Sequence, residues 1–116
     1  MNPRPYTVFM LLKSTAQWLA LSPDQREAIY DRAQLKVFNR FPEVRLRFFD
    51  ASAFHGRCSD VLVWETSDMP EYRDAVEALR CDELLAKPYF DVLDVIPSMA
   101  DGGREPLTHP LLAAWA

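Results

Sequence analysis

Short apolar runs and longer segments of helical periodicity alternate along this chain. Strand-forming residues such as Val, Leu, Phe and Trp are concentrated in 6–13, 44–49, 60–66 and 90–96. Between the first and second runs, and again between the third and fourth, apolar residues recur every three or four positions among charged ones, which is typical of amphipathic helices. The pattern predicts the order strand, helix, strand, strand, helix, strand.

Both predicted helices begin at sequences that cap a helix. Ser22 is followed by Pro23 and Gln25, so the serine and glutamine side chains are spaced to form a capping box. Asp68 and Glu71 repeat this spacing before the second helix. We therefore expect each helix to begin directly after its capping residue.

The predicted order is typical of the ferredoxin-like βαββαβ fold, an α+β fold in which four antiparallel strands carry both helices on one face. The 116 residues, 49% of them hydrophobic, are enough for one domain with a real core. We expect that domain to cover residues 1–100. Residues 101–116 contain two glycines and two prolines, which predicts an irregular tail.

The run VRLRFFD at 44–50 places two arginines on one face of a predicted strand. Alternation puts Val44, Leu46 and Phe48 on one side and Arg45 and Arg47 on the other. Burying unpaired guanidinium groups under the helices is costly, so the apolar set is expected to face the helices. The arginines are then expected on the open face of the sheet.

On the third strand we expect Leu62 and Trp64 to share that open face, with the intervening valines under the helices. With these residues and Phe49 the open face is too apolar to be left in water. A second copy of the sheet is the expected cover, which predicts a homodimer enclosing a partly polar space. The alternative cover is the chain's own LLAAW segment at 111–115.

Net charge, the N-terminal segment and the cysteines indicate which partners, which compartment and which thiol state to expect. The net charge of −4 is spread along the chain, which gives no reason to expect nucleic acid or a membrane surface as a partner. The N-terminal apolar run is too short to span a bilayer and lacks a cleavage site, so a cytoplasmic protein is expected. Cys58 and Cys81 fit neither a zinc site nor a redox pair, and we expect reduced thiols.

Three segments of the chain resemble the darcynin family of small bacterial proteins. They are YTVFMLLKSTAQWLALS, VRLRFFDASAF and DVLVWETSDMPEYR, and the similarity covers about residues 5–97. The resemblance implies a ferredoxin-like domain similar to dimeric α/β-barrel proteins. That group includes cofactor-free monooxygenases, haem enzymes and stress-response proteins.

One end of the predicted sheet gathers candidate catalytic groups. His55 lies between Asp50 and Asp60, so it is a candidate general base oriented by a carboxylate; the alternative is an exposed turn histidine. No metal site is expected, because His55 and His109 lack a third ligand. Trp18 is either a lid packed on the first helix or part of a pocket wall.

Two functions remain open from the sequence. The favoured one is a non-catalytic homodimer that binds a small acidic organic ligand between its sheets, with Arg45, Arg47, Trp64 and Trp18 as the binding residues. Ion pairs with Asp94 or Glu65 are the alternative role of the arginines. The second function is a cofactor-independent enzyme of the monooxygenase or isomerase type, in which His55 or Asp60 moves a proton. Neither function calls for a cofactor.

Overall fold

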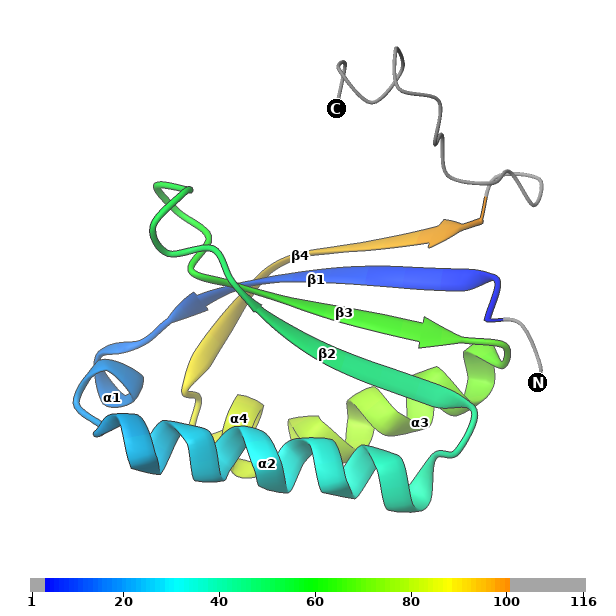
Figure 1. Cartoon of the computed structure of the whole chain (residues 1–116), viewed down its shortest axis with the longest axis horizontal. Coiled ribbons are helices and arrows are strands. Elements are labelled where there is room, and N and C mark those ends of the chain that lie inside the picture. Colours follow the sequence, from blue (N-terminus) through cyan, green and yellow to red (C-terminus); the bar gives the residue numbers. More distant parts are fainter. Residues whose placement is uncertain (1–3, 101–116) are drawn as a thin grey trace, which may run out of the picture.

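The four strands and the two long helices follow the predicted order, and a helix of four residues is added before the first long helix and after the second. A computed structural model describes residues 4–100, and Figure 1 shows one four-stranded sheet with every helix on the same face. The elements are β1 (Tyr6–Ser14), α1 (Ala16–Leu19), α2 (Pro23–Arg40), β2 (Val44–Asp50), β3 (Asp60–Thr66), α3 (Met69–Arg80), α4 (Glu83–Ala86) and β4 (Phe90–Met99). The strands are antiparallel in the order β2-β3-β1-β4, which confirms the ferredoxin-like α+β fold.

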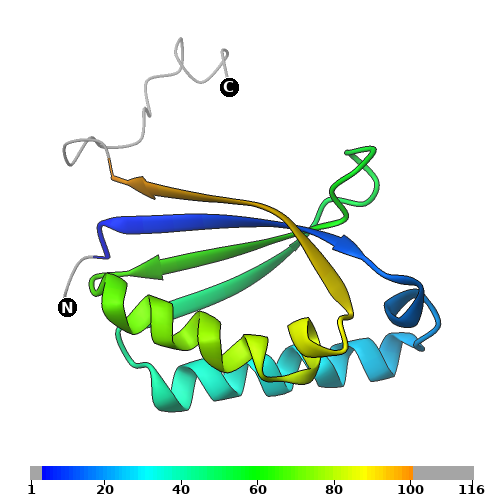
Figure 2. The same cartoon turned by 180° about the vertical axis from the view of Figure 1, so that it is seen from behind.

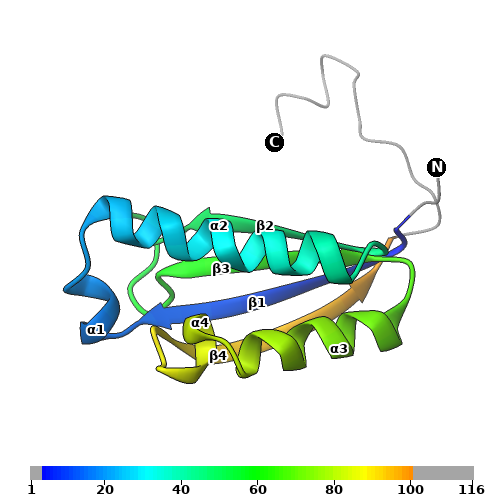
Figure 3. The ribbon, with the colours of Figure 1, turned by 90° about the horizontal axis from the view of Figure 1, so that it is seen from below.

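The helix layer consists of α2 and α3 lying side by side beneath the strands (Figure 3). The capping box of α2 is present: the Ser22 hydroxyl accepts from the Gln25 backbone N–H at 3.2 Å, and the Gln25 side chain accepts from the Ser22 N–H at 2.8 Å. Asp68 caps α3 by accepting from the Glu71 N–H at 3.0 Å. The Glu71 carboxylate instead accepts from the Glu43 N–H at 2.8 Å, so it ties α3 to the start of β2.

The core lies between the sheet and the helices. On β2, Val44 and Leu46 are buried while Arg45 and Arg47 are exposed, as the alternation predicts. The largest core residues from the other strands and the helices are Val8, Met10, Leu12, Leu62, Trp64, Leu79, Leu84 and Phe90. The face of the sheet opposite the helices is not covered by any helix of the described residues (Figure 2).

The predicted orientation of β3 is wrong. Leu62 and Trp64 face the helices and are fully buried, and the Trp64 ring packs edge-on against Tyr72 of α3 at 5.5 Å between centroids. Pairing decides this orientation, because Trp64 lies opposite Val8 and Leu46, which belong to the helix-facing sets of their strands. Both alternating sets of β3 are apolar, so its own pattern did not distinguish the two faces.

The two outer strands leave free edges on the described sheet. β2 pairs only with β3, and β4 pairs only with β1. The β1–β4 pairing shifts register between Leu11 and Leu12, which leaves Leu93 as the extra residue of a bulge. The predicted tail at 101–116, with His109 and the LLAAW segment, lies outside the described residues. Within residues 4–100, no helix has the length and apolarity needed to cross a membrane.

Candidate functional site

The open face of the sheet carries one of its two arginines in an ion pair. Arg47 approaches the Glu65 carboxylate at 3.3 Å, and its guanidinium lies 5.3 Å from the centre of the Phe49 ring. Both partners of this ion pair keep part of their side chains in solvent, so the pair contributes little to stability. Its consequence is local: Glu65 neutralises much of the charge that Arg47 would offer to a ligand.

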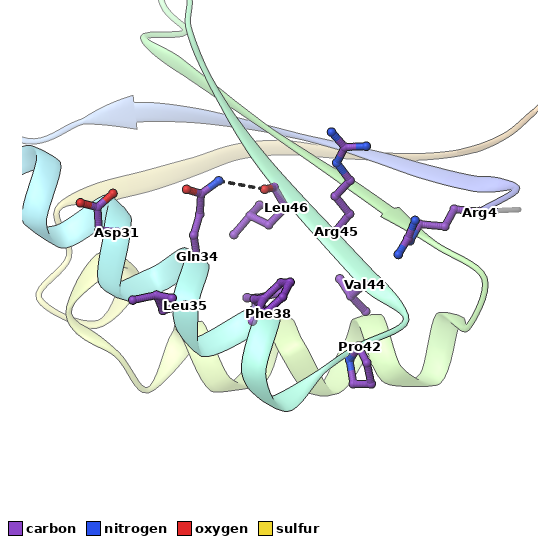
Figure 4. Close-up of a pocket in the computed structure, with 10 residues that line it drawn as sticks. Arg4, Asp31, Gln34, Leu35, Phe38, Pro42, Val44, Arg45 and Leu46 are labelled. Atoms are coloured by element: carbon purple, nitrogen blue, oxygen red, sulfur yellow. Dashed lines mark hydrogen bonds between the residues drawn. The ribbon is translucent and has the colours of Figure 1, made fainter. Parts of the chain in front are cut away.

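Arg45 differs from its neighbour. It is exposed on β2 and lies opposite Glu65 in the β2–β3 register, yet it forms no ion pair with any residue of 4–100. Figure 4 shows its side chain directed away from α2. Arg45 is therefore the arginine of this face whose charge is available.

Exposed apolar side chains accompany the arginines. Phe9 of β1 and Ile96 of β4 lie opposite each other in the register, and they are 38% and 46% exposed. Phe49 at the end of β2 is 45% exposed. The open face is thus apolar, as predicted, but through these residues and not through Leu62 and Trp64.

The connection between β2 and β3, residues 51–59, rises on the side of the sheet opposite the helices (Figures 1 and 2). His55 shapes this loop, because its Nδ1 accepts from the backbone N–H groups of Cys58 at 2.9 Å and Arg57 at 3.1 Å. The histidine side chain is exposed. His55 therefore occupies the position of an exposed turn histidine, the alternative to a general base.

The carboxylates expected beside His55 have other partners. Asp60 accepts a hydrogen bond of 2.9 Å from the Tyr30 hydroxyl on the helix side. Asp50 accepts from the Ser52 hydroxyl and backbone N–H, and these two bonds hold the pKa of Asp50 below its ordinary value. Among the described residues no hydrogen bond joins His55 to either carboxylate, so the predicted proton relay is not assembled.

Trp18 belongs to an aromatic cluster in the core. It is 4% exposed, and its ring packs against Tyr30, Tyr89 and Phe90 at centroid distances of 5.1, 5.6 and 4.6 Å. Arg26 of α2 donates to the backbone oxygens of Trp18 and Leu19 and so fastens α1 onto α2. Trp18 and Trp64 both lie in the core, and neither lines the open face.

The two cysteines are free thiols in separate environments. Cys58 is buried and its Sγ lies 3.3 Å from the Asp60 backbone oxygen, whereas Cys81 is exposed. Across residues 4–100, no three His, Cys, Asp or Glu side chains are grouped closely enough to hold a metal ion. The described residues therefore offer neither a disulfide nor a metal centre.

The structure has a groove between α2 and β2 that the sequence did not predict. Its volume is about 810 Å³, and it is lined by Arg4, Asp31, Gln34, Leu35, Val37, Phe38, Pro42, Val44, Arg45 and Leu46 (Figure 4). The Gln34 amide crosses it and donates to the Leu46 backbone oxygen at 3.1 Å. The sequence feature that could have indicated the groove is the pair Leu35 and Phe38. These two large apolar residues of α2 lie outside the set that the helix buries in the core.

Comparison with protein families and relatives gives a consistent result. A family model described as "Darcynin, domain of unknown function" matches residues 1–111. A Darcynin from Chromobacterium violaceum is 46% identical over 69 residues, which cover 60% of this chain and 87% of that protein. A Darcynin homolog from Streptomyces avermitilis is 35% identical over 109 residues, which cover 89% of each.

Solved structures show the same fold at low sequence identity. A mutant chlorite dismutase from Candidatus Nitrospira defluvii in complex with cyanide superposes with a TM-score of 0.70 at 16% identity, covering 87% of this chain and 42% of that one. A heme-binding protein from Thermus thermophilus gives a TM-score of 0.69 at 16% identity, covering 85% and 41%. The chain thus spans less than half the length of these two proteins, and the fold is of the dimeric α/β-barrel type.

Proposed function

The chain belongs to the darcynin family, and we propose that it is a homodimeric binding domain that holds a small organic acid between the open faces of two sheets. The observation that carries this proposal is Arg45, an exposed arginine without an ion pair among residues 4–100, on a face that also exposes Phe9, Phe49 and Ile96. A charged group and apolar groups on one open surface are the features of an interface that encloses a polar ligand.

Pairing through this face has a physical rationale. Phe9 and Ile96 form an apolar cross-strand pair whose burial against a second copy would be favourable. Four strands of 9, 7, 7 and 10 residues, spaced about 4.8 Å with a rise of about 3.3 Å per residue, present a planar area of only about 500 Å². Stable interfaces bury roughly 800 Å² per partner. The 51–59 loop, which rises on the same side and exposes Phe54, is the segment that would supply further contact.

The arginines of the proposed interface favour an acid as the ligand. We propose that the two-fold axis passes close to β2, so that Arg45 of both copies lies in the same enclosed space, where water is scarce. Two guanidinium groups in such a space need an anion, and a carboxylate accepts their paired donors with good geometry. Arg47 is already compensated by Glu65, so we assign the main binding role to Arg45 and a supporting role to Arg47.

Sedimentation velocity tests the dimer. We expect the unmodified protein to sediment as a dimer at micromolar concentration, and Phe9→Asp to sediment as a monomer, because the substitution buries a carboxylate in the proposed interface. Leu19→Asp is the matched control, since Leu19 is exposed on α1 and lies off the open face. A monomeric unmodified protein, or a dimer that survives Phe9→Asp, contradicts the proposal.

A thermal-shift screen of small aromatic and aliphatic acids tests the ligand. Ligands that bind the folded state raise the melting temperature, so at least one acid should stabilise the protein. Arg45→Gln should abolish that stabilisation, while Arg73→Gln, which removes an exposed arginine of α3, should keep it. Stabilisation unaffected by Arg45→Gln would exclude the arginine site.

The enzyme alternative has no comparable support among the described residues. His55 uses its Nδ1 to accept from two backbone amides, and Asp60 is bonded to Tyr30, so the two groups proposed to move a proton have separate partners. A general base must lie within hydrogen-bond reach of the proton that it abstracts. We therefore propose a binding domain and not an enzyme.

The described residues also do not fit a haem group, which the Thermus thermophilus protein is named as binding. Haem iron is commonly held by His, Cys, Met or Tyr. His55 is the one histidine in residues 4–100 and it is exposed in the 51–59 loop, and the α2/β2 groove is lined by none of these four residue types. We propose no haem chemistry for this chain.

The free thiols of Cys58 and Cys81 support a reducing compartment, for which we propose the cytoplasm. We also propose that residues 1–100 form the single folded domain, because the sheet, its helices and one continuous core account for residues 4–100.

A further inference from the structure

The groove between α2 and β2 has an apolar wall that is unusual for a surface helix. Phe38 and Leu35 of α2 are 76% and 58% exposed, although the helix already buries Ile29, Ala33 and Val37 in the core. Figure 4 shows Phe38 lying between the last turns of α2 and strand β2. Val44 and Leu46 of β2 line the opposite side. The groove is therefore apolar along α2.

A cation, Arg4, lies at one end of this groove. Arg4 lies beside the beginning of β2, whereas Asp31 lies farther back along α2 (Figure 4). The Nε of Arg4 is buried and has no hydrogen-bond partner within residues 4–100. A buried donor without a partner is costly, and an anion bound at this end would satisfy it.

We propose that the groove binds a small amphipathic monocarboxylate, an acid with an alkyl or aryl body. The carboxylate accepts hydrogen bonds from Arg4, and the apolar body packs against Phe38 and Leu35. The volume of about 810 Å³ is that of a small-molecule site. From Asp31 to Phe38 the helix rises about 10 Å, which suits an alkyl chain of medium length.

A peptide strand is a poorer occupant. β2 is an edge strand, so its outward backbone groups are in principle free to pair with an added strand. However, the Leu46 carbonyl already accepts a hydrogen bond from the Gln34 side chain, which bridges α2 and β2 across the groove. An added strand would have to break this bridge, whereas a small acid lying beside it would not.

This site is independent of the proposed function because its defining residues are Arg4 and Phe38, which do not lie on the open face. Arg45 is one of the residues that line the groove, but its side chain is directed away from α2 (Figure 4). The open-face dimer leaves the α2 side of the molecule uncovered, so both sites can exist in one molecule. Their tests therefore use different variants.

Calorimetric titration with decanoate tests the groove. We expect saturable 1:1 binding, weakened about tenfold or more by Arg4→Gln and by Phe38→Ser, since each removes a main contact. The matched controls are Arg73→Gln and Phe54→Ser, which change an exposed arginine of α3 and an exposed phenylalanine of the 51–59 loop. Decyltrimethylammonium should not compete. Equal affinity in the groove and control variants, or no saturable binding to the unmodified protein, overturns the proposal.

The location is tested separately from the dimer. In amide-detected NMR, decanoate should shift the Gln34 side-chain amide and the backbone amides of α2 around Phe38. The Phe9→Asp variant should bind decanoate with unchanged affinity. Shifts confined to Arg47 and Val61 on the open face, or loss of binding in Phe9→Asp, would show that the acid binds between the sheets. Either result would overturn the groove assignment.

Discussion

The Tyr30 hydroxyl donates a hydrogen bond of 2.9 Å to the carboxylate of Asp60, which joins the middle of α2 to the first residue of β3. The Tyr30 ring also packs on Trp18 and Phe48, at 5.1 and 4.5 Å between centroids. This contact connects the helix layer to the sheet at the end where the sequence had suggested catalytic chemistry. It makes Asp60 a structural partner of α2.

Removing the Tyr30 hydroxyl should destabilise the fold. Tyr30→Phe keeps the ring and leaves Asp60 without its donor, so we expect a loss of about 1–2 kcal/mol in the free energy of unfolding, measured with urea. Tyr72→Phe is the matched control, because the Tyr72 hydroxyl has no hydrogen bond within the described residues; its cost should be below about 0.5 kcal/mol. Equal losses in the two variants would contradict the assignment.

The same tyrosine predicts alkaline sensitivity. Burial first, and then the negative charge and hydrogen bond of Asp60, raise the pKa of Tyr30 far above its ordinary value. The folded state therefore keeps a proton that the unfolded chain loses above about pH 10, so stability falls as pH rises beyond that value. The difference in unfolding free energy between the unmodified protein and Tyr30→Phe should shrink from neutral pH to about pH 11. A constant difference would show that Tyr30 does not titrate this way.

Asp82 should contribute to stability in the opposite pH range. Burial raises the pKa of Asp82, but bonds from Lys36 and the Glu83 N–H outweigh it and leave the pKa below its ordinary value. The contribution is therefore present above about pH 4 and is lost as pH falls through the lower, folded-state pKa. Asp82→Ala should lose about 1 kcal/mol at neutral pH, as for a helix cap. Urea titrations should show this loss disappearing in acid; a loss that persists there would point to packing alone.

The position of Trp64 in the core predicts which substitutions it tolerates. Trp64→Ala should cost about 3–5 kcal/mol in the free energy of unfolding, as for other large core residues. Trp64→Phe should cost much less, because the buried indole N–H has no hydrogen-bond partner in the described structure and its removal recovers that penalty. Leu19→Ala is the control and should change unfolding little, because Leu19 is exposed on α1 and lies off the open face. If Trp64→Ala proved as mild as the control, the ring would not be in the core.

The candidate site was predictable in part, and particular residues show why. Alternation along β2 placed Arg45 and Arg47 on the open face because a buried guanidinium without a partner is too costly. The same reasoning did not determine the orientation of Trp64, because β3 is apolar on both sides. The sequence also named Glu65 as one possible partner of Arg47, and the structure shows that ion pair.

The element order, the capping residues and the side of β2 that carries the arginines were determined by the sequence alone, because each depends on neighbours within a few positions. Only the tertiary structure decided that Trp64 faces the helices, that Asp60 pairs with Tyr30, and that α2 and β2 border a groove. These features depend on strand register and on how a helix lies across the sheet, which join residues far apart in the chain.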